Sequence, residues 1–155
     1  ARIGALVTKN KAVYNAALKF AQARLSPPTF EQILGEAACA LPEDYFNEVL
    51  AEYQLRRDTL INGLKTIEGV TVPNPGGAFY VMVKLPIEDA EDFCKWILSE
   101  YSYNGATVMM AQGNGFYSTP GSGNNEVRLA YVLNKTDIEN AIEVLRHAIL
   151  AYQNK

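Results

Sequence analysis

Arg128 is the residue whose neighbours in the sequence point most directly to chemistry. It lies in residues 127–132 (VRLAYV), an apolar stretch with the composition of a β-strand. A guanidinium buried there without a partner would be costly, so we expect an anion to meet its planar fork of donors. Two interpretations are open: a structural ion pair with an acid such as Glu126 or one from a neighbouring helix, and a bidentate clamp for a substrate carboxylate.

Arg2 raises the same question near the start of the chain. It lies between small residues, and Gly4 follows it, where a missing side chain permits close approach to the backbone. Arginines near a chain end are commonly solvated. An anion site and a plain solvated side chain are therefore both open for Arg2.

The Gly-rich segment 112–121 does not have the sequence context of a phosphate-binding loop. Such a loop opens a helix whose N-terminal amides face the anion, whereas this segment leads into the strand of Arg128. It is either a mobile loop beside a site or a plain surface connection.

Metal and nucleophile chemistry find little support. His147 is the only histidine, and we expect it on the exposed flank of the last helix, so no metal site is predicted. Cys39 and Cys94 have no partner base and no C-x-x-C spacing. We expect both to be buried thiols in a reducing compartment, by default the cytoplasm.

The composition predicts a soluble globular protein that binds a small ligand. Of 155 residues, 48% are hydrophobic and 20% charged, and the formal net charge is −3. Acids and bases are interleaved without a basic stripe, so we expect neither nucleic acid nor a membrane as partner. The chain begins without Met or a signal peptide, which favours a fragment, although a processed chain is compatible with the same residues.

The first part of the chain is predicted to form a strand and three helices. Residues 3–8 favour a strand, and helical spacing follows at 13–24 until Pro27 and Pro28. A second helical pattern covers 31–41, with Thr29 as its predicted N-cap. Pro42 suits the first turn of a helix of about 25 residues, which at 1.5 Å per residue spans about 40 Å and is long enough to bridge two domains.

Beyond Gly69 the pattern is that of a smaller α/β unit. The closing helix has a capping box at Thr136 and Glu139, and Asn104-Gly105 is the expected left-handed stop of the helix before it. In chain order we expect a strand at 70–73, a turn at 74–77, a strand at 78–85, a helix at 89–101, a strand at 107–110, a loop at 112–125, a strand at 126–132 and the closing helix.

Five segments, in order along the chain, resemble motifs of one enzyme family, the fold type I pyridoxal-phosphate-dependent aminotransferases of the aspartate aminotransferase type. The segments are Arg2-Ile3-Gly4, Ser26-Pro27-Pro28-Thr29-Phe30-Glu31-Gln32, Tyr53-Gln54-Leu55-Arg56-Arg57-Asp58, Pro75-Gly76-Gly77-Ala78-Phe79-Tyr80 and Val127-Arg128-Leu129-Ala130. The first is similar to the end of the family's signature, in which a lysine binds the cofactor and an arginine holds its phosphate. The resemblance covers nearly the whole chain.

The resemblance implies a role for each matching residue. Arg2 would pair with the phosphate of pyridoxal phosphate, Arg128 would clamp the α-carboxylate of the amino acid, and Phe79 or Tyr80 would lie near the site. In such enzymes the cofactor ring acts as an electron sink while an amino group passes from an amino acid to a 2-oxo acid. The two cationic anchors would orient the substrate relative to that ring.

The family's Schiff-base lysine should precede Arg2, outside this sequence. None of the lysines present occupies the motif position, namely Lys9, Lys11, Lys19, Lys65, Lys84, Lys95, Lys135 and Lys155. The family's ring-nitrogen aspartate and stacking aromatic also belong to the earlier part of the large domain. The chain is therefore expected to carry no catalytic residue and to be inactive by itself.

The expected fold is α/β, the C-terminal part of the aspartate aminotransferase fold. Residues 1–41 would be the trailing part of the large pyridoxal-phosphate-binding domain, and 42–155 the connecting helix with a small two-layer α/β domain. Expected partners are the amino acid and 2-oxo acid substrates, the remainder of the large domain and a second copy in a homodimer. Arg24 is a candidate contact for a substrate side-chain carboxylate across that dimer, with a solvated helix end as the alternative.

Two other functions are open. A carbon–sulfur lyase or cyclopropane-forming synthase of the same fold type would reuse both arginines, and its products would distinguish it. A non-catalytic small-molecule binding domain would use Arg128 as its anion site.

Overall fold

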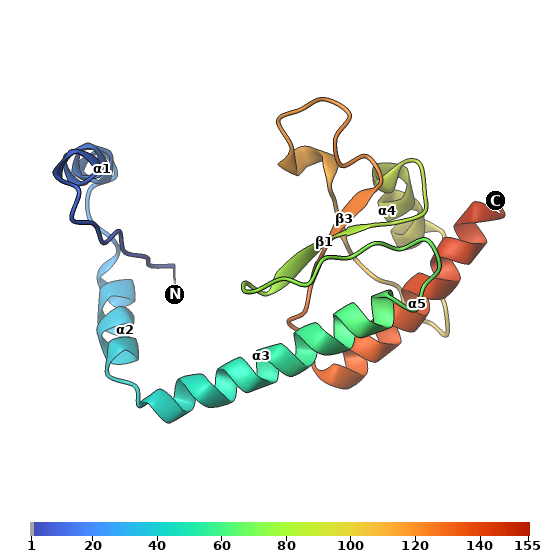
Figure 1. Ribbon diagram of the computed structural model, residues 1–155, viewed down its shortest axis with the longest axis horizontal. Helices are drawn as coiled ribbons and strands as arrows, with labels where there is room; N and C mark the ends of the chain where they lie inside the picture. The colour runs from blue at the N-terminus through green and yellow to red at the C-terminus, as the bar shows by residue number, and fades with distance from the viewer. Residues whose placement is uncertain (1) are drawn as a thin grey trace. The chain divides into compact units, whose positions relative to one another are not determined.

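The computed structural model describes residues 2–155 and divides into two compact units, Ala1–Asn47 and Glu48–Lys155. The boundary falls inside helix α3 (Glu43–Leu64), so each unit contains part of this helix (Figure 1). The long helix predicted from Pro42 is thus confirmed, with 22 residues. Among the described helices, none is both long and apolar enough to cross a membrane.

The first unit consists of two helices and irregular chain. Helix α1 (Lys11–Ala23) is capped by Asn10, whose side-chain oxygen accepts from the N–H groups of Ala12 and Val13 at 3.0 and 3.2 Å. Helix α2 (Thr29–Cys39) begins after Pro28 without a side-chain cap, so the predicted cap at Thr29 is wrong. Thr29 already lies in the first turn, where a residue cannot take the extended backbone that a cap requires.

The strand predicted at residues 3–8 does not form, because a β-strand needs a neighbouring strand to receive its hydrogen bonds and the described residues offer none. The buried core residues of the described chain all lie from Leu60 onward, and Cys39 is exposed, against the expectation of a buried thiol. Large apolar side chains of this unit are open to solvent, with Phe20 at 77% and Phe30 at 80% exposure.

The second unit is built on an antiparallel sheet with the strand order β1-β3-β2. The strands are β1 (Tyr80–Lys84), β2 (Ala111–Gln112) and β3 (Glu126–Ala130). In the register of the sheet, Met82 of β1 and Ala111 of β2 lie opposite Arg128 on the central strand. Arg128 is therefore held between neighbours on both sides.

One face of the sheet is covered by helices and the other is not, which gives the expected two-layer α/β arrangement. Alternate residues Val81, Val83, Val127 and Leu129 are buried, as the period of two along a strand requires. They join one core with the second half of α3, with α4 (Ala90–Ser99) and with α5 (Lys135–Gln153) (Figure 1). Since the apolar core covers one face of the sheet, polar and charged side chains of the strands lie on the other face.

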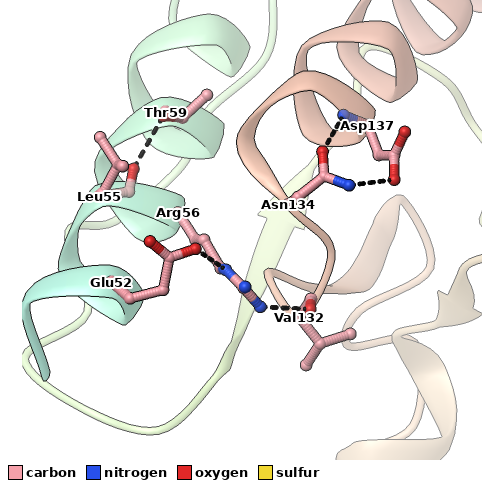
Figure 2. Close-up of polar contacts among 7 residues, drawn as sticks. All are labelled: Glu52, Leu55, Arg56, Thr59, Val132, Asn134 and Asp137. Atoms are coloured by element: carbon pink, nitrogen blue, oxygen red, sulfur yellow. Dashed lines mark hydrogen bonds and ion pairs between the residues drawn. The ribbon is translucent and has the colours of Figure 1, made fainter. Parts of the chain in front are cut away.

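Helices α3 and α5 pack closely enough that a side chain at Gly63 would collide with Ile142, since an added Cβ would lie 2.4 Å from the Ile142 Cδ1. A polar contact also ties α3 to the chain that leaves β3. Arg56 donates to the backbone oxygen of Val132 at 2.6 Å and to Glu52 at 2.7 Å (Figure 2). These contacts fix where β3 ends relative to α3.

Two of the strands predicted in this unit are wrong. Residues 70–73 make only an isolated bridge, Thr71 with Lys84, because the Pro73 that follows has no N–H to continue a ladder. Residues 107–110 are irregular, since the Thr107 hydroxyl donates to the Ile97 carbonyl at 2.6 Å, and strand pairing begins only at Ala111.

Two predicted helix boundaries also differ. Helix α5 is capped by Asn134, whose side chain accepts from the Asp137 N–H at 2.9 Å, so it begins before the predicted capping box of Thr136 and Glu139 (Figure 2). Asn104 and Gly105 do adopt left-handed conformations, with φ of 51° and 76°. They form a tight turn after the helix, which itself ends at Ser99.

Candidate functional site

Arg128 projects from the central strand on the face of the sheet that the helices leave open. Its neighbours Val127 and Leu129 point into the core, so strand alternation puts Arg128 on the same face as Glu126 and Ala130. The side chain is half-buried there. The expectation that the guanidinium is buried in apolar surroundings is corrected accordingly, because the second layer of helices covers only the opposite face.

Two aromatic rings flank the guanidinium. The Arg128 Cζ lies 5.3 Å from the ring centre of Tyr80 and 4.7 Å from that of Phe116, which ends the short 3-10 helix Asn114–Phe116. Cations within about 6 Å of a ring are attracted to its negative face. The rings position the guanidinium but accept no hydrogen bond from its N–H groups. These N–H groups therefore remain available to an anion.

No carboxylate satisfies Arg128 within residues 2–155, where its side chain makes neither an ion pair nor a hydrogen bond. Glu126, the acid named as a structural partner, instead accepts a hydrogen bond from the Tyr117 hydroxyl. The internal ion pair is therefore not what the structure contains. The arrangement can bind an external carboxylate at a cation already stripped of part of its water.

The two predicted aromatic residues differ in their relation to Arg128. Tyr80 lies against the guanidinium, whereas Phe79 precedes β1 and makes its ring contact with Tyr80, with ring centres 5.5 Å apart and planes at 89°. Both are exposed, at 52% for Phe79 and 43% for Tyr80. The structure thus brings Tyr80, and not Phe79, into contact with the cation.

Phe116 and Tyr117 were not identified as site residues from the sequence. The sequence shows only that their loop is Gly-rich. The position of the loop beside β3 depends on contacts with Glu126, which lies about ten residues further along the chain. Two aromatic residues within an otherwise small and polar loop were the available signal, because a solvated connection has little use for them.

Arg2 and Arg24 line a single pocket of about 280 Å³ in the first unit, together with Gly4, Ser26 and Pro27. Two arginines and a serine, all exposed, carry side-chain donors of the kind that bind a phosphate, which has close to two negative charges at neutral pH. Neither arginine has a side-chain ion pair within residues 2–155. The residues present therefore fit the phosphate of a cofactor.

His147 serves packing. Its ring stacks on Tyr103 with ring centres 4.0 Å apart and planes at 15°. Because His147 is half-buried, the prediction that it lies on an exposed flank is wrong.

The thiol of Cys94 is buried in the core, and burial raises its pKa to about 11, which keeps it protonated.

A family model described as Aminotransferase class I and II matches residues 1–145. The aspartate aminotransferase of Rhizobium meliloti (strain 1021) is 28% identical over 154 residues, which cover 92% of this chain and 35% of that protein. The LL-diaminopimelate aminotransferase of Moorella thermoacetica is 31% identical over 119 residues, covering 76% of this chain and 28% of the relative.

Solved structures agree with the sequence comparison. The alanine aminotransferase from Pyrococcus furiosus superimposes with a TM-score of 0.72 at 26% identity, over 92% of this chain and 36% of its own. The α-aminoadipate aminotransferase from Thermus thermophilus gives 0.73 at 23% identity, over 91% and 36%, and shows the fold alone. The chain has part of the aspartate aminotransferase fold and spans about a third of the length of these proteins.

Proposed function

Because the chain belongs to the aminotransferase class I and II family, we propose that it is the C-terminal part of an enzyme that moves an amino group from an amino acid to a 2-oxo acid through pyridoxal phosphate. The observation that carries this proposal is the Arg128 guanidinium, flanked by aromatic rings and unpaired within the described residues. In this proposal Arg128 binds the α-carboxylate that amino acids and 2-oxo acids share.

Arg128 contributes binding and orientation. A carboxylate that meets the planar guanidinium with both oxygens is fixed in direction as well as position, which a single point charge cannot achieve. The rings of Tyr80 and Phe116 restrict the guanidinium and shield it from water, so less order has to be gained on binding. The substrate's α-carbon is thereby held at a constant place relative to the sheet.

Arg2 would hold the cofactor phosphate, with Arg24 lining the same pocket. When bound, pyridoxal phosphate supplies an electron-accepting ring for chemistry at the substrate's α-carbon. The lysine that the family resemblance places before Arg2 is not among the residues of this chain, so we propose that the chain alone does not turn over substrate. Two free thiols are in keeping with the proposed cytoplasmic location.

The exposed apolar side chains of the first unit support its assignment to a larger domain. Phe20 and Phe30 are more than three-quarters exposed, and apolar surface of this kind normally meets a partner. We propose that residues 1–41 end the large cofactor domain and that 42–155 form the connecting helix and small domain. The remainder of the large domain and a second copy of the protein would cover this surface.

The test is Arg128→Lys in the complete protein that contains this chain. Loss of the bidentate geometry is expected to lower kcat/KM for amino acids by on the order of 10²-fold. Arg146→Lys is the matched control, because Arg146 bonds Thr66 on the far side of the core. Unchanged kinetics for Arg128→Lys would exclude the clamp, and products other than a new amino acid and a new 2-oxo acid would favour a lyase or synthase.

A further inference from the structure

Glu126 is placed where it could compete with a substrate for Arg128. The two residues are two positions apart on β3 and share the open face, so their Cα atoms are about 7 Å apart at the rise of a strand. Side chains of this length can bridge that separation. A carboxylate tethered so near would have a high effective concentration at the guanidinium.

Tyr117 removes Glu126 from this competition in the structure. Its hydroxyl donates a hydrogen bond to Glu126 Oε2, and this bond raises the pKa of Tyr117, so the hydroxyl remains a donor at neutral pH. Lys84 lies opposite Glu126 in the sheet register but forms no ion pair with it within residues 2–155. Tyr117 is thus the group that engages the Glu126 side chain.

The loop is shaped to deliver this hydroxyl. The Gly113 N–H donates to the Glu126 carbonyl at 2.6 Å, which fastens the start of the loop to β3. At Gly123 an added Cβ would lie 2.6 Å from Cδ2 of the Tyr117 ring, and the backbone has φ of 74°. The ring therefore occupies the space that a side chain at residue 123 would need.

We propose that Tyr117 is a positioning residue that holds Glu126 away from Arg128 and so keeps the guanidinium open to the substrate carboxylate. The proposal rests on the function proposed above, since it requires that Arg128 binds substrate. Phe116, the preceding residue, contacts the guanidinium itself. Two consecutive residues of the loop thus contact the two charged side chains of β3, Phe116 that of Arg128 and Tyr117 that of Glu126.

The experiment is a double-mutant cycle in the complete protein. Tyr117→Phe keeps the ring and frees Glu126. If the freed carboxylate occupied Arg128 for roughly 70–90% of the time, the KM for amino acids would rise by about 3- to 10-fold with little change in kcat. Adding Glu126→Gln to Tyr117→Phe removes the competing charge and is expected to return KM to within about 2-fold of the unmodified protein.

Tyr152→Phe is the matched control, because it also removes a hydroxyl that donates to a carboxylate, that of Asp92 at 2.6 Å, outside the site. Its KM is expected to be unchanged. Gly123→Ala should displace the Tyr117 ring and raise KM as Tyr117→Phe does, again with rescue by Glu126→Gln.

The outcomes separate the two proposals. A raised KM in Tyr117→Phe that Glu126→Gln does not rescue would overturn the positioning role, and so would an unchanged KM in Tyr117→Phe while Arg128→Lys raises it. Unchanged kinetics in Arg128→Lys would exclude the carboxylate clamp itself, whatever the outcome for Tyr117→Phe.

Discussion

The hydroxyl of Tyr131 lies 3.0 Å from the carbonyl oxygen of Ala78 and holds the turn that precedes Tyr80. The carbonyl of Gly77 is within the same reach, at 3.1 Å, and the Tyr131 ring is 1% exposed. Ala78 has a φ of 63°, a left-handed conformation that non-glycine residues adopt only when their surroundings impose it. Tyr131, the residue that follows β3, thus fixes the turn from which Tyr80 enters β1 and reaches Arg128.

Tyr131→Phe is expected to lower the free energy of unfolding by about 1–2 kcal/mol, because two carbonyls lose their shared donor in a half-buried place. Urea unfolding followed by the fluorescence of Trp96, the single tryptophan and a core residue, measures the change. Faster amide exchange at Tyr131, whose N–H donates to the Phe79 carbonyl at 2.9 Å, should accompany it. A midpoint equal to that of the unmodified protein would mean that the turn is held by other contacts.

Arg2→Gln in the complete protein is expected to weaken the binding of pyridoxal phosphate by roughly 10- to 100-fold, because one charge-assisted contact to the phosphate is lost. Titration of the cofactor at equilibrium measures this directly. Pyridoxal without its phosphate serves as the control ligand, and its affinity should not change. Equal weakening of both ligands would place the effect of Arg2 elsewhere than at the phosphate.

The two cysteines are expected to react at very different rates. Cys39 is exposed, whereas Cys94 is buried and its pKa is about 11. In the native 155-residue chain at pH 8, a chromogenic disulfide reagent should titrate one thiol rapidly and the second only after unfolding in urea. Cys39→Ser should abolish the rapid phase. A rapid phase that survives this substitution would show that the packing of α4 around Cys94 opens readily.

The stability that Tyr152 contributes to the fold is expected to be lost in alkaline solution. Its hydrogen bond to Asp92, followed by burial, raises its pKa to about 12, against about 10 in an unfolded chain. A raised pKa means that the folded state holds the proton more tightly, so this contribution is complete below pH 10 and is lost as the pH rises towards 12. Tyr152→Phe should therefore lose less stability than the unmodified chain between pH 10 and 12, measured by urea midpoints. Parallel curves would contradict the raised pKa.

Helices were predicted from the sequence more successfully than strands, and the reason is physical. The apolar period of a helix lies within the segment itself, so the predicted helices are found, as α1 and α4 illustrate, although the caps predicted at Thr29 and Thr136 are wrong. A strand exists only where another strand accepts its hydrogen bonds. Residues 3–8 and 107–110 have strand-forming composition without a partner, whereas Tyr80–Lys84 has one in β3.

The candidate site was predicted in part. Arg128 was identifiable because a cation in an apolar strand demands an explanation, and the same reasoning wrongly placed it in the interior. Phe116 and Tyr117 could not be assigned, since their contacts depend on close approaches at Gly113 and Gly123 that only the folded loop reveals. The roles of Arg2, Phe79 and Tyr80 remain predictions that follow from the family resemblance.

Strand β3 carries two independent sets of positions in one pentapeptide. Val127 and Leu129 are buried in the core, while Glu126, Arg128 and Ala130 lie on the open face of the sheet. Substitutions at the even positions can therefore change the open face of the sheet without disturbing the core. Inserting or deleting a single residue, by contrast, would turn the buried side chains to the open face and the open-face side chains into the core. Substitutions are therefore tolerable in this strand, whereas insertions and deletions are not.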